Sequence, residues 1–153
     1  MYQGKSLIII PSYNEAENIV EIINDVLIQK ESFHLLIVDD NSPDKTYKLV
    51  EEEIIKNPKK IFLIKREKKS GLGSAYLAGF KWAIENGYEK IFEMDADYSH
   101  DPKDLLRMDV FLDNDGYDVV IGSRYVSGVN VVNWPIQRVL LSYFASIYAR
   151  LIT

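Results

Sequence analysis

Short apolar runs alternate with segments of helical periodicity along most of this chain, and this alternation limits the possible fold more than any other feature. The runs occupy residues 7–10, 33–38, 61–64, 91–94 and 118–121, and each of them ends in a polar loop. After the first of these loops, for example, Ile19, Ile22, Ile23 and Val26 recur at helical spacing. Strands that alternate with helices predict an α/β fold, with a mainly parallel sheet flanked by helices and joined by right-handed crossovers.

Two local signals predict where helices begin. Asn14 and Glu17 resemble a capping box, so we expect the first helix to begin near Asn14. Pro102 suits the first turn of the helix that follows the fourth run, because the missing N–H of proline would be unpaired there in any case.

The composition excludes several classes of protein. The 153 residues are 47% hydrophobic and 27% charged, as expected of one globular domain over residues 1–153. The absence of cysteine excludes disulfides and thiolate metal sites, and the net charge of −5 argues against nucleic acid as the main partner. We see no signal peptide and no uncharged run long enough to span a bilayer, so we expect a soluble or membrane-peripheral protein.

Carboxylates follow the fourth strand-like run. Asp95 and Asp97 are one residue apart and should emerge where the strand ends. Two close carboxylates ionise together at low cost only when a cation lies between them, and hard oxygen ligands favour Mg²⁺ or Mn²⁺. An isolated Asp-x-Asp is more often a solvated acidic turn, so the interpretation as a metal site depends on what the other loops contribute.

The strand-to-helix loops of a parallel sheet all open at the carboxyl ends of the strands, so these loops should meet at one edge. They would bring together Tyr13, Glu15, Asp39, Asp40, Asp95, Asp97 and Arg124. Glu15 and Asp40 suit hydrogen bonds from a base or a ribose, and Tyr13 suits stacking on a base. For Asp44 and Asp101 we expect helix caps or turns instead.

Several familiar enzyme motifs are absent. The first strand is followed by Pro11-Ser12-Tyr13-Asn14-Glu15 and not by the G-x-G-x-x-G turn of dinucleotide-binding folds, and neither a G-x-x-x-x-G-K-[ST] loop nor a G-x-S-x-G elbow occurs. His34 lies inside a strand-like run and is expected to be a packed core residue. What remains is a metal held by carboxylates, which normally completes its shell with phosphate oxygens and makes a diphosphate a good leaving group.

Six segments carry a further pattern. They are PSYNE at 11–15, VDDNSPD at 38–44, GLGSAY at 71–76, MDADYSH at 94–100, GSRY at 122–125 and WPIQR at 134–138. Taken in order, they resemble the dolichol-phosphate (polyprenol-phosphate) mannosyltransferases, a family of inverting glycosyltransferases with the GT-A fold. The resemblance covers nearly the whole chain, so it implies the same nucleotide-sugar-binding fold here.

The resemblance implies a donor site, expected to take GDP-mannose, and a divalent cofactor, Mg²⁺ or Mn²⁺. Its donor-binding residues would be Pro11, Tyr13, Glu15, Val38, Asp40, Asp95, Ala96, Asp97 and Arg124. Its metal ligands would be Asp95, Asp97 and Ser99, and its catalytic residues Asp97, Arg124 and Arg138. The two arginines match family residues near the diphosphate and the acceptor phosphate, whose geometry suits a guanidinium fork.

The implied reaction is a single displacement in which polyprenyl (dolichyl) phosphate attacks the anomeric carbon of mannose with inversion. A phosphate monoester is largely anionic near neutral pH, because its second pKa is about 6. A strong general base, which a hydroxyl acceptor would need, can therefore be absent.

The chain departs from the family's pattern in two respects. Asn41 stands where the family often has Gly, a change that a left-handed turn tolerates. Family domains also continue past the Trp-Pro segment, so we expect an incomplete catalytic domain that continues beyond Thr153. The helix expected over 136–151 is apolar on more than one face. It is the expected route to the lipid, at the cytosolic face of a membrane or on a membrane subunit.

Three alternatives stay open at the level of sequence. A related transferase could use a UDP-sugar, because nothing in these loops reads the base explicitly. A metal-dependent phosphohydrolase also uses Asp-x-Asp, although there the nucleophilic Asp usually follows the first strand. A non-catalytic nucleotide-sugar-binding domain would need Tyr13 and Asp40 but not Arg124 and Arg138.

Overall fold

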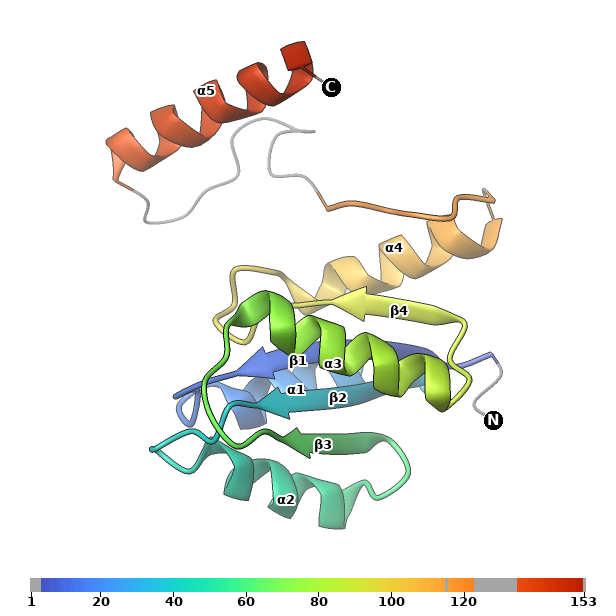
Figure 1. Cartoon of the computed structure of the whole chain (residues 1–153). Coiled ribbons are helices and arrows are strands. Elements are labelled where there is room, and N and C mark those ends of the chain that lie inside the picture. The colour runs from blue at the N-terminus through green and yellow to red at the C-terminus, as the bar shows by residue number, and fades with distance from the viewer. Residues whose placement is uncertain (1–3, 115, 123–134, 153) are drawn as a thin grey trace. The chain divides into compact units, whose positions relative to one another are not determined.

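Four parallel strands form the centre of the first of two structural units, Met1–Val120, which is described separately from the second, Ile121–Thr153. The computed structural model describes residues 4–114, 116–122 and 135–152. The strands, in the spatial order β3-β2-β1-β4 (Figure 1), are β1 (Ser6–Ser12), β2 (Phe33–Asp39), β3 (Ile61–Lys65) and β4 (Lys90–Glu93). The predicted α/β class with a parallel sheet is confirmed.

The register of β1 aligns the ends of the strands. Ser6 lies opposite Phe33 of β2 and Lys90 of β4, and Ser12 lies opposite Asp39, the last residue of β2. All strands run the same way, so the loops that follow them leave the sheet at one edge (Figure 1). The strand order reverses beside β1, and in open parallel sheets ligands bind at the carboxyl ends of the strands near such a reversal.

The helices cover the sheet on both faces. On one face lie α1 (Ile19–Leu27), α2 (Thr46–Lys56) and α4 (Pro102–Asn114), and on the other lies α3 (Leu72–Glu85) (Figure 1). The connections from β1 to β2 and from β2 to β3 advance in one direction across the sheet, whereas α3 leads back to β4. Right-handed crossovers in opposite directions place their helices on opposite faces, which explains why α3 lies alone.

Each central strand is buried on both sides. Ile8 and Ile10 of β1 pack in the core under α1, α2 and α4, whereas Leu7 and Ile9 pack in the core under α3. All four side chains are fully buried. Burial of both faces is the reason that these strands read in the sequence as continuous apolar runs and not as alternating ones.

A buried carboxylate joins α4 to the amino-terminal edge of the sheet. Asp109 is fully buried and accepts hydrogen bonds from the Ser6 hydroxyl (2.9 Å), from Lys90 Nζ (3.0 Å) and from Lys30 Nζ. Burial alone would raise the pKa of Asp109, but these donors lower it below the ordinary value. The charge is therefore paired, as a buried ion must be to persist in a fold.

Two sequence-based predictions about element boundaries are wrong. The first helix begins at Ile19 and not near Asn14, which has a left-handed backbone (φ 61°) and whose N–H donates to Ser42 Oγ in the loop after β2. No strand forms over the described residues 116–122, where Val119 and Ile121 are 72% and 82% exposed and so gain little from burial. Pro102, in contrast, begins α4 as predicted.

The second unit contains the helix α5 (Ile136–Ile152). Its exposed apolar side chains include Leu141, Phe144, Tyr148 and Leu151. Within the described part of the chain, no helix combines the length and apolar character needed to cross a bilayer.

The close contact between α3 and β1 yields a prediction about stability. A Cβ atom added at Gly79 of α3 would lie 2.6 Å from Cγ2 of Ile9, a fully buried residue of the central strand. We expect Gly79→Ala to lower the free energy of unfolding, because overpacking costs about 1–3 kcal/mol and outweighs the gain of about 1 kcal/mol in helix propensity. Urea unfolding measures the difference.

The matched control is Gly73→Ala in the same helix, where a Cβ atom would meet nothing within 4 Å. This variant should be as stable as the parent chain or slightly more stable. Equal effects of the two substitutions would contradict the proposed contact.

Candidate functional site

Four loops at the carboxyl edge of the sheet form the candidate site. The loops after β1, β2 and β3 surround a hollow of about 440 Å³. It is lined by Tyr13, Asp40, Asn41, Ser42, Pro43, Lys45, Tyr47, Glu67, Lys68 and Lys69. Three lysines and two tyrosines among these residues suit a ligand that combines negative charge with an aromatic ring.

Lys69 lies over the ring of Tyr13, the side chain predicted to stack on a base. Its Nζ atom is 3.9 Å from the ring centroid, and Lys65 Nζ lies 3.3 Å from the centroid of the Tyr47 ring. Both are cation–π contacts. A base that stacked on the same face of Tyr13 would have to displace the Lys69 ammonium, which would then be free to meet a phosphate.

Asp40 is held by Arg66, a residue that the sequence analysis did not assign to the site. Arg66 Nη2 donates to Asp40 Oδ2 (2.7 Å), Arg66 Nε donates to Oδ1, and the backbone N–H of Ser70 donates to Oδ2 (3.0 Å). Burial alone would raise the pKa of Asp40, but these donors lower it. The position of Arg66 in a basic loop directly after the third strand was the signal that could have identified it.

Asp39 is a buried carboxylate at the end of β2, beneath the loops of the site. It is fully buried and accepts hydrogen bonds from Ser12 Oγ (2.9 Å), the backbone N–H of Ser42 (2.9 Å) and Ser42 Oγ (2.6 Å). These contacts join the loops after β1 and β2. Asp44 has a similar structural role, as predicted, because it accepts from the N–H and hydroxyl of Thr46 at the start of α2.

Three other residues predicted for the donor site, on β1, on β2 and in the loop after β1, do not line the hollow. Glu15 is half-buried, and its Oε2 accepts from Asn18 Nδ2 (3.1 Å) just before α1. Pro11 lies opposite Val38 in the register of β1 and β2, and Val38 is fully buried under α3.

The loop after β4 carries the Asp-x-Asp segment. Asp95 is half-buried and accepts from the Tyr76 hydroxyl of α3 (3.0 Å), while Ala96 is buried and Asp97 and Ser99 are exposed. Burial and the nearby Asp95 raise the pKa of Tyr76, so this phenol remains a donor. Tyr76 is a further residue beside the site. No role there was predicted for it from the sequence.

Asp97 is ionised at neutral pH. The Ser99 N–H donates to Asp97 Oδ1 (2.9 Å), and this hydrogen bond together with the Ser99 hydroxyl lowers the pKa of Asp97 against the opposing effect of burial. His100 lies beside the segment and accepts at Nδ1 from the backbone N–H of Asp95 (3.1 Å). The structure therefore brings Asp95, Asp97 and Ser99 into one short turn.

These side chains could bind a hard cation only together with further ligands from water or a substrate. Over residues 4–114, 116–122 and 135–152, no group of three or more His, Cys, Asp or Glu side chains is arranged to hold a metal ion. Two carboxylates and a hydroxyl nevertheless suit Mg²⁺, which is usually bound by one or two carboxylates and completed by water and substrate phosphates.

Of the two predicted arginines, one lies outside the described residues and the other belongs to the second unit. Arg124 lies outside the described residues, as does Trp134. Arg138 is exposed near the start of α5, and its N–H donates to the carbonyl of Pro135 (2.9 Å). It belongs to the second unit, which is described by itself.

Comparison with known proteins finds matches over nearly the whole chain. The model of the family "Glycosyl transferase family 2" matches residues 7–152. The polyprenol monophosphomannose synthase of Mycolicibacterium smegmatis is 46% identical over 95% of this chain and 55% of its own length. The dolichol-phosphate mannosyltransferase of Pyrococcus furiosus is 40% identical over 96% of this chain and 41% of its own. The chain thus spans about half the length of the curated relatives that it matches.

A solved structure agrees with the architecture. The crystal structure of S. aureus TarS 1-349 matches 86% of this chain and 38% of its own, with a TM-score of 0.64 and 26% sequence identity. The resemblance read from the sequence motifs is confirmed by the named relatives. The GT-A-type fold that it implied is confirmed by the family match and the structural likeness.

The ion pair between Arg66 and Asp40 predicts a change in acid stability. The pKa of Asp40 is lowered in the folded chain. The ion pair therefore stabilises the fold at pH values above the unfolded-state pKa of about 3.9, and this contribution is lost as the pH falls through the folded-state pKa. Arg66→Met should lower the free energy of unfolding at neutral pH. Below about pH 4 the free energies of unfolding of the variant and the parent should become more similar. Urea unfolding across this range measures both.

Arg107→Met is the control, because Arg107 forms an ion pair with Asp104 (3.0 Å) in which both side chains are exposed. Such pairs contribute little, so this variant should differ from the parent by less than about 1 kcal/mol at each pH. A difference between Arg66→Met and the parent that did not change with pH would contradict the interpretation.

Proposed function

This chain belongs to glycosyl transferase family 2, and from that premise we propose that residues 1–153 form part of the catalytic domain of a polyprenyl-phosphate mannosyltransferase. The enzyme transfers mannose from GDP-mannose to a polyprenyl (dolichyl) phosphate with inversion at the anomeric carbon. The observation that carries the proposal is the 46% identity, over 95% of this chain, to a polyprenol monophosphomannose synthase.

The donor nucleotide binds in the hollow at the ends of β1, β2 and β3. The base stacks on Tyr13 and Asp40 accepts hydrogen bonds from it, because a carboxylate held by Arg66 is ionised and fixed in orientation. Lys69, displaced from the Tyr13 ring, meets the diphosphate. Pro11, Glu15 and Val38 complete the proposed donor site from positions beside the hollow.

Asp97 presents the sugar-diphosphate to the acceptor. A divalent ion, Mg²⁺ or Mn²⁺, would neutralise the charge that develops on the departing diphosphate. Asp97 would hold this ion with Asp95 and Ser99, and Tyr76 fixes the orientation of Asp95 through its hydrogen bond. The structural support for this part of the proposal is an exposed, ionised Asp97 at the same edge of the sheet as the hollow.

Arg124 and Arg138 act on the phosphates. Their guanidinium groups suit the diphosphate of the donor and the phosphate of the acceptor, respectively. The acceptor phosphate attacks the anomeric carbon as its own nucleophile, since it is largely anionic near neutral pH, with a second pKa of about 6. The proposal therefore assigns no side chain as a strong general base.

The lipid part of the acceptor calls for a membrane surface or a membrane subunit. The exposed apolar side chains of α5, among them Leu141, Phe144 and Leu151, suit the boundary between headgroups and acyl chains. We therefore assign the protein to the cytosolic face of a membrane as a peripheral protein, with α5 as the element that meets it.

The test of the proposed function is transfer of labelled mannose from GDP-mannose to a polyprenyl phosphate by the full-length protein, with Mg²⁺ or Mn²⁺. We expect Asp97→Asn to reduce the transfer rate by about 100-fold, because the group that stabilises the developing charge is lost. Asp101→Asn is the matched control. Asp101 accepts from the Lys103 N–H at the start of α4, and Asn caps helices equally well, so this variant should retain transfer and stability.

Each contrary result has a distinct meaning. Full activity of Asp97→Asn, or equal transfer without divalent ions, would contradict the assigned role of Asp97. Competition of UDP against GDP for the hollow distinguishes the donors, and stronger competition by UDP would assign the chain to UDP-sugar transfer. Binding of nucleotide without transfer to any polyprenyl phosphate would favour a non-catalytic domain.

A further inference from the structure

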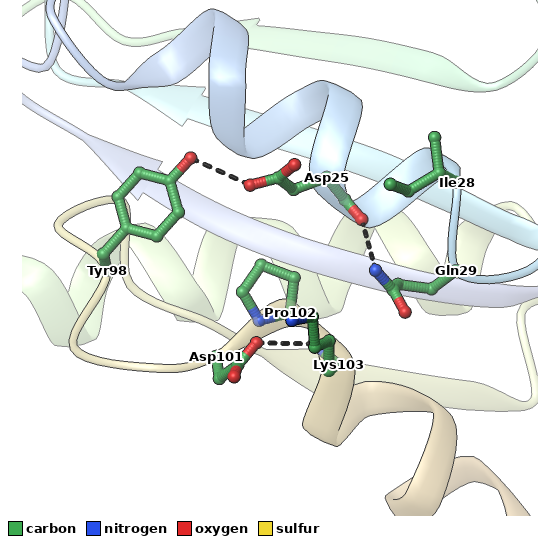
Figure 2. A pocket seen from close by; sticks show the side chains of 7 residues that line it. All are labelled: Asp25, Ile28, Gln29, Tyr98, Asp101, Pro102 and Lys103. Atoms are coloured by element: carbon green, nitrogen blue, oxygen red, sulfur yellow. Dashed lines mark hydrogen bonds between the residues drawn. The ribbon is translucent and has the colours of Figure 1, made fainter.

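The loop that carries Asp97 borders a second hollow, which lies between this loop and α1. This second hollow has a volume of about 400 Å³ and is lined by Asp25, Ile28, Gln29, Tyr98, Asp101, Pro102 and Lys103 (Figure 2). Tyr98 and the start of α4 border it on one side and the last turn of α1 on the other. Tyr98 is 39% exposed, so its ring is only partly packed and polar contacts can add to the packing that holds the loop.

A hydrogen bond crosses the hollow. The Tyr98 hydroxyl donates to Asp25 Oδ2 of α1 at 3.0 Å, as Figure 2 shows, although the two residues are 73 positions apart in the sequence. A phenol is protonated at physiological pH, so Tyr98 donates this hydrogen bond and the Asp25 carboxylate accepts it. Hydrogen bonds to an ionised group are about twice as strong as neutral ones.

The backbone of Tyr98 is in a conformation that needs such support. Its φ angle is 58°, in the left-handed region that a bulky residue rarely adopts. A backbone conformation of this kind is strained and persists only where its surroundings hold it. The turn that Tyr98 makes also brings the Ser99 N–H back onto the Asp97 carboxylate, at 2.9 Å.

We propose that Tyr98 is a positioning residue, which holds the Asp97 turn in place by its hydrogen bond to Asp25 of α1. The Tyr98 side chain is directed toward α1 (Figure 2), and in this proposal it acts through its neighbour Asp97. This role rests on the proposed function, because it matters only if Asp97 binds the divalent ion of a nucleotide-sugar donor. Asp25 is the second member of the same tether.

The experiment uses the full chain and three variants: Tyr98→Phe, which removes only the hydroxyl, Asp25→Ala, and the double variant. Binding of Mn²⁺ in the presence of GDP is followed by the paramagnetic resonance signal of the free ion. Tyr98→Phe and Asp25→Ala should each weaken Mn²⁺ binding roughly three- to tenfold, as expected for loss of one hydrogen bond to a charged group. The double variant should be no weaker than either single one, because all three break the same contact.

A second readout needs neither metal nor nucleotide. The Ser99 amide, which donates to Asp97, should exchange its hydrogen faster with solvent in Tyr98→Phe than in the parent chain. Tyr117→Phe is the matched control, since it removes a hydroxyl from a ring that is 58% exposed, and it should change neither Mn²⁺ binding nor exchange.

The outcomes separate the two proposals. Three results would overturn the tether and leave the proposed function standing. They are unchanged hydrogen exchange of Ser99 in Tyr98→Phe, unchanged Mn²⁺ affinity of the variants, or additive effects of the two single substitutions. Equal Mn²⁺ binding by the parent and by Asp97→Asn would overturn the proposed metal site itself, and with it the use of the tether in donor binding, even if the exchange of Ser99 responds as expected.

Discussion

The parallel pairing of β1 with β2 and with β4 is the constraint on which the rest of the structure depends. Its register places Ser12 opposite Asp39 and sends the following loops out at one edge. Burial of both faces of the sheet then leaves that edge as the place where polar side chains can collect without disturbing the core. The candidate site is a consequence of this geometry.

Carboxylates at the two ends of the sheet have different hydrogen-bond partners, and these partners differ between the buried carboxylates and the one proposed to bind a ligand. Asp109 at the amino-terminal edge meets two lysines, and Asp39 beneath the site meets the hydroxyls of two serines. Asp40 meets the fork of Arg66. Asp97 is exposed and hydrogen-bonded to Ser99, so it is the carboxylate best placed to gain a ligand from outside.

The loop after β4 combines contacts that stabilise the fold with the carboxylate that we propose for the chemistry. The loop after β4 joins the sheet to α4, which Asp109 anchors to the amino-terminal edge of the sheet, and the same loop carries Asp97. Tyr76 of α3 holds Asp95 from one face of the sheet, and Asp25 of α1 holds Tyr98 from the other. Both faces of the fold therefore contribute to the orientation of a short exposed turn.

The sequence by itself determined the elements and the edge. Apolar runs identified the four strands, periodic residues identified the helices, and polar residues at the strand ends placed Tyr13, Asp40, Asp95 and Asp97 in the loops at one edge of the sheet, because these features depend on local pattern and on the rule that parallel loops share an edge. The six ordered motifs also identified the family. The local roles of Asp44 and Asp101 were predictable for the same reason, since a cap involves residues two positions away.

Only the tertiary structure decided which partners the polar groups found. Arg66 meets Asp40 across 26 positions and Tyr98 meets Asp25 across 73, and no local pattern specifies such pairs. The burial of Asp39, the start of α1 at Ile19 and the absence of a strand over the described residues 116–122 were likewise decided by packing between elements. The physical reason is that hydrogen-bond partners and burial depend on which segments the fold brings together, whereas periodicity and capping depend only on neighbours along the chain.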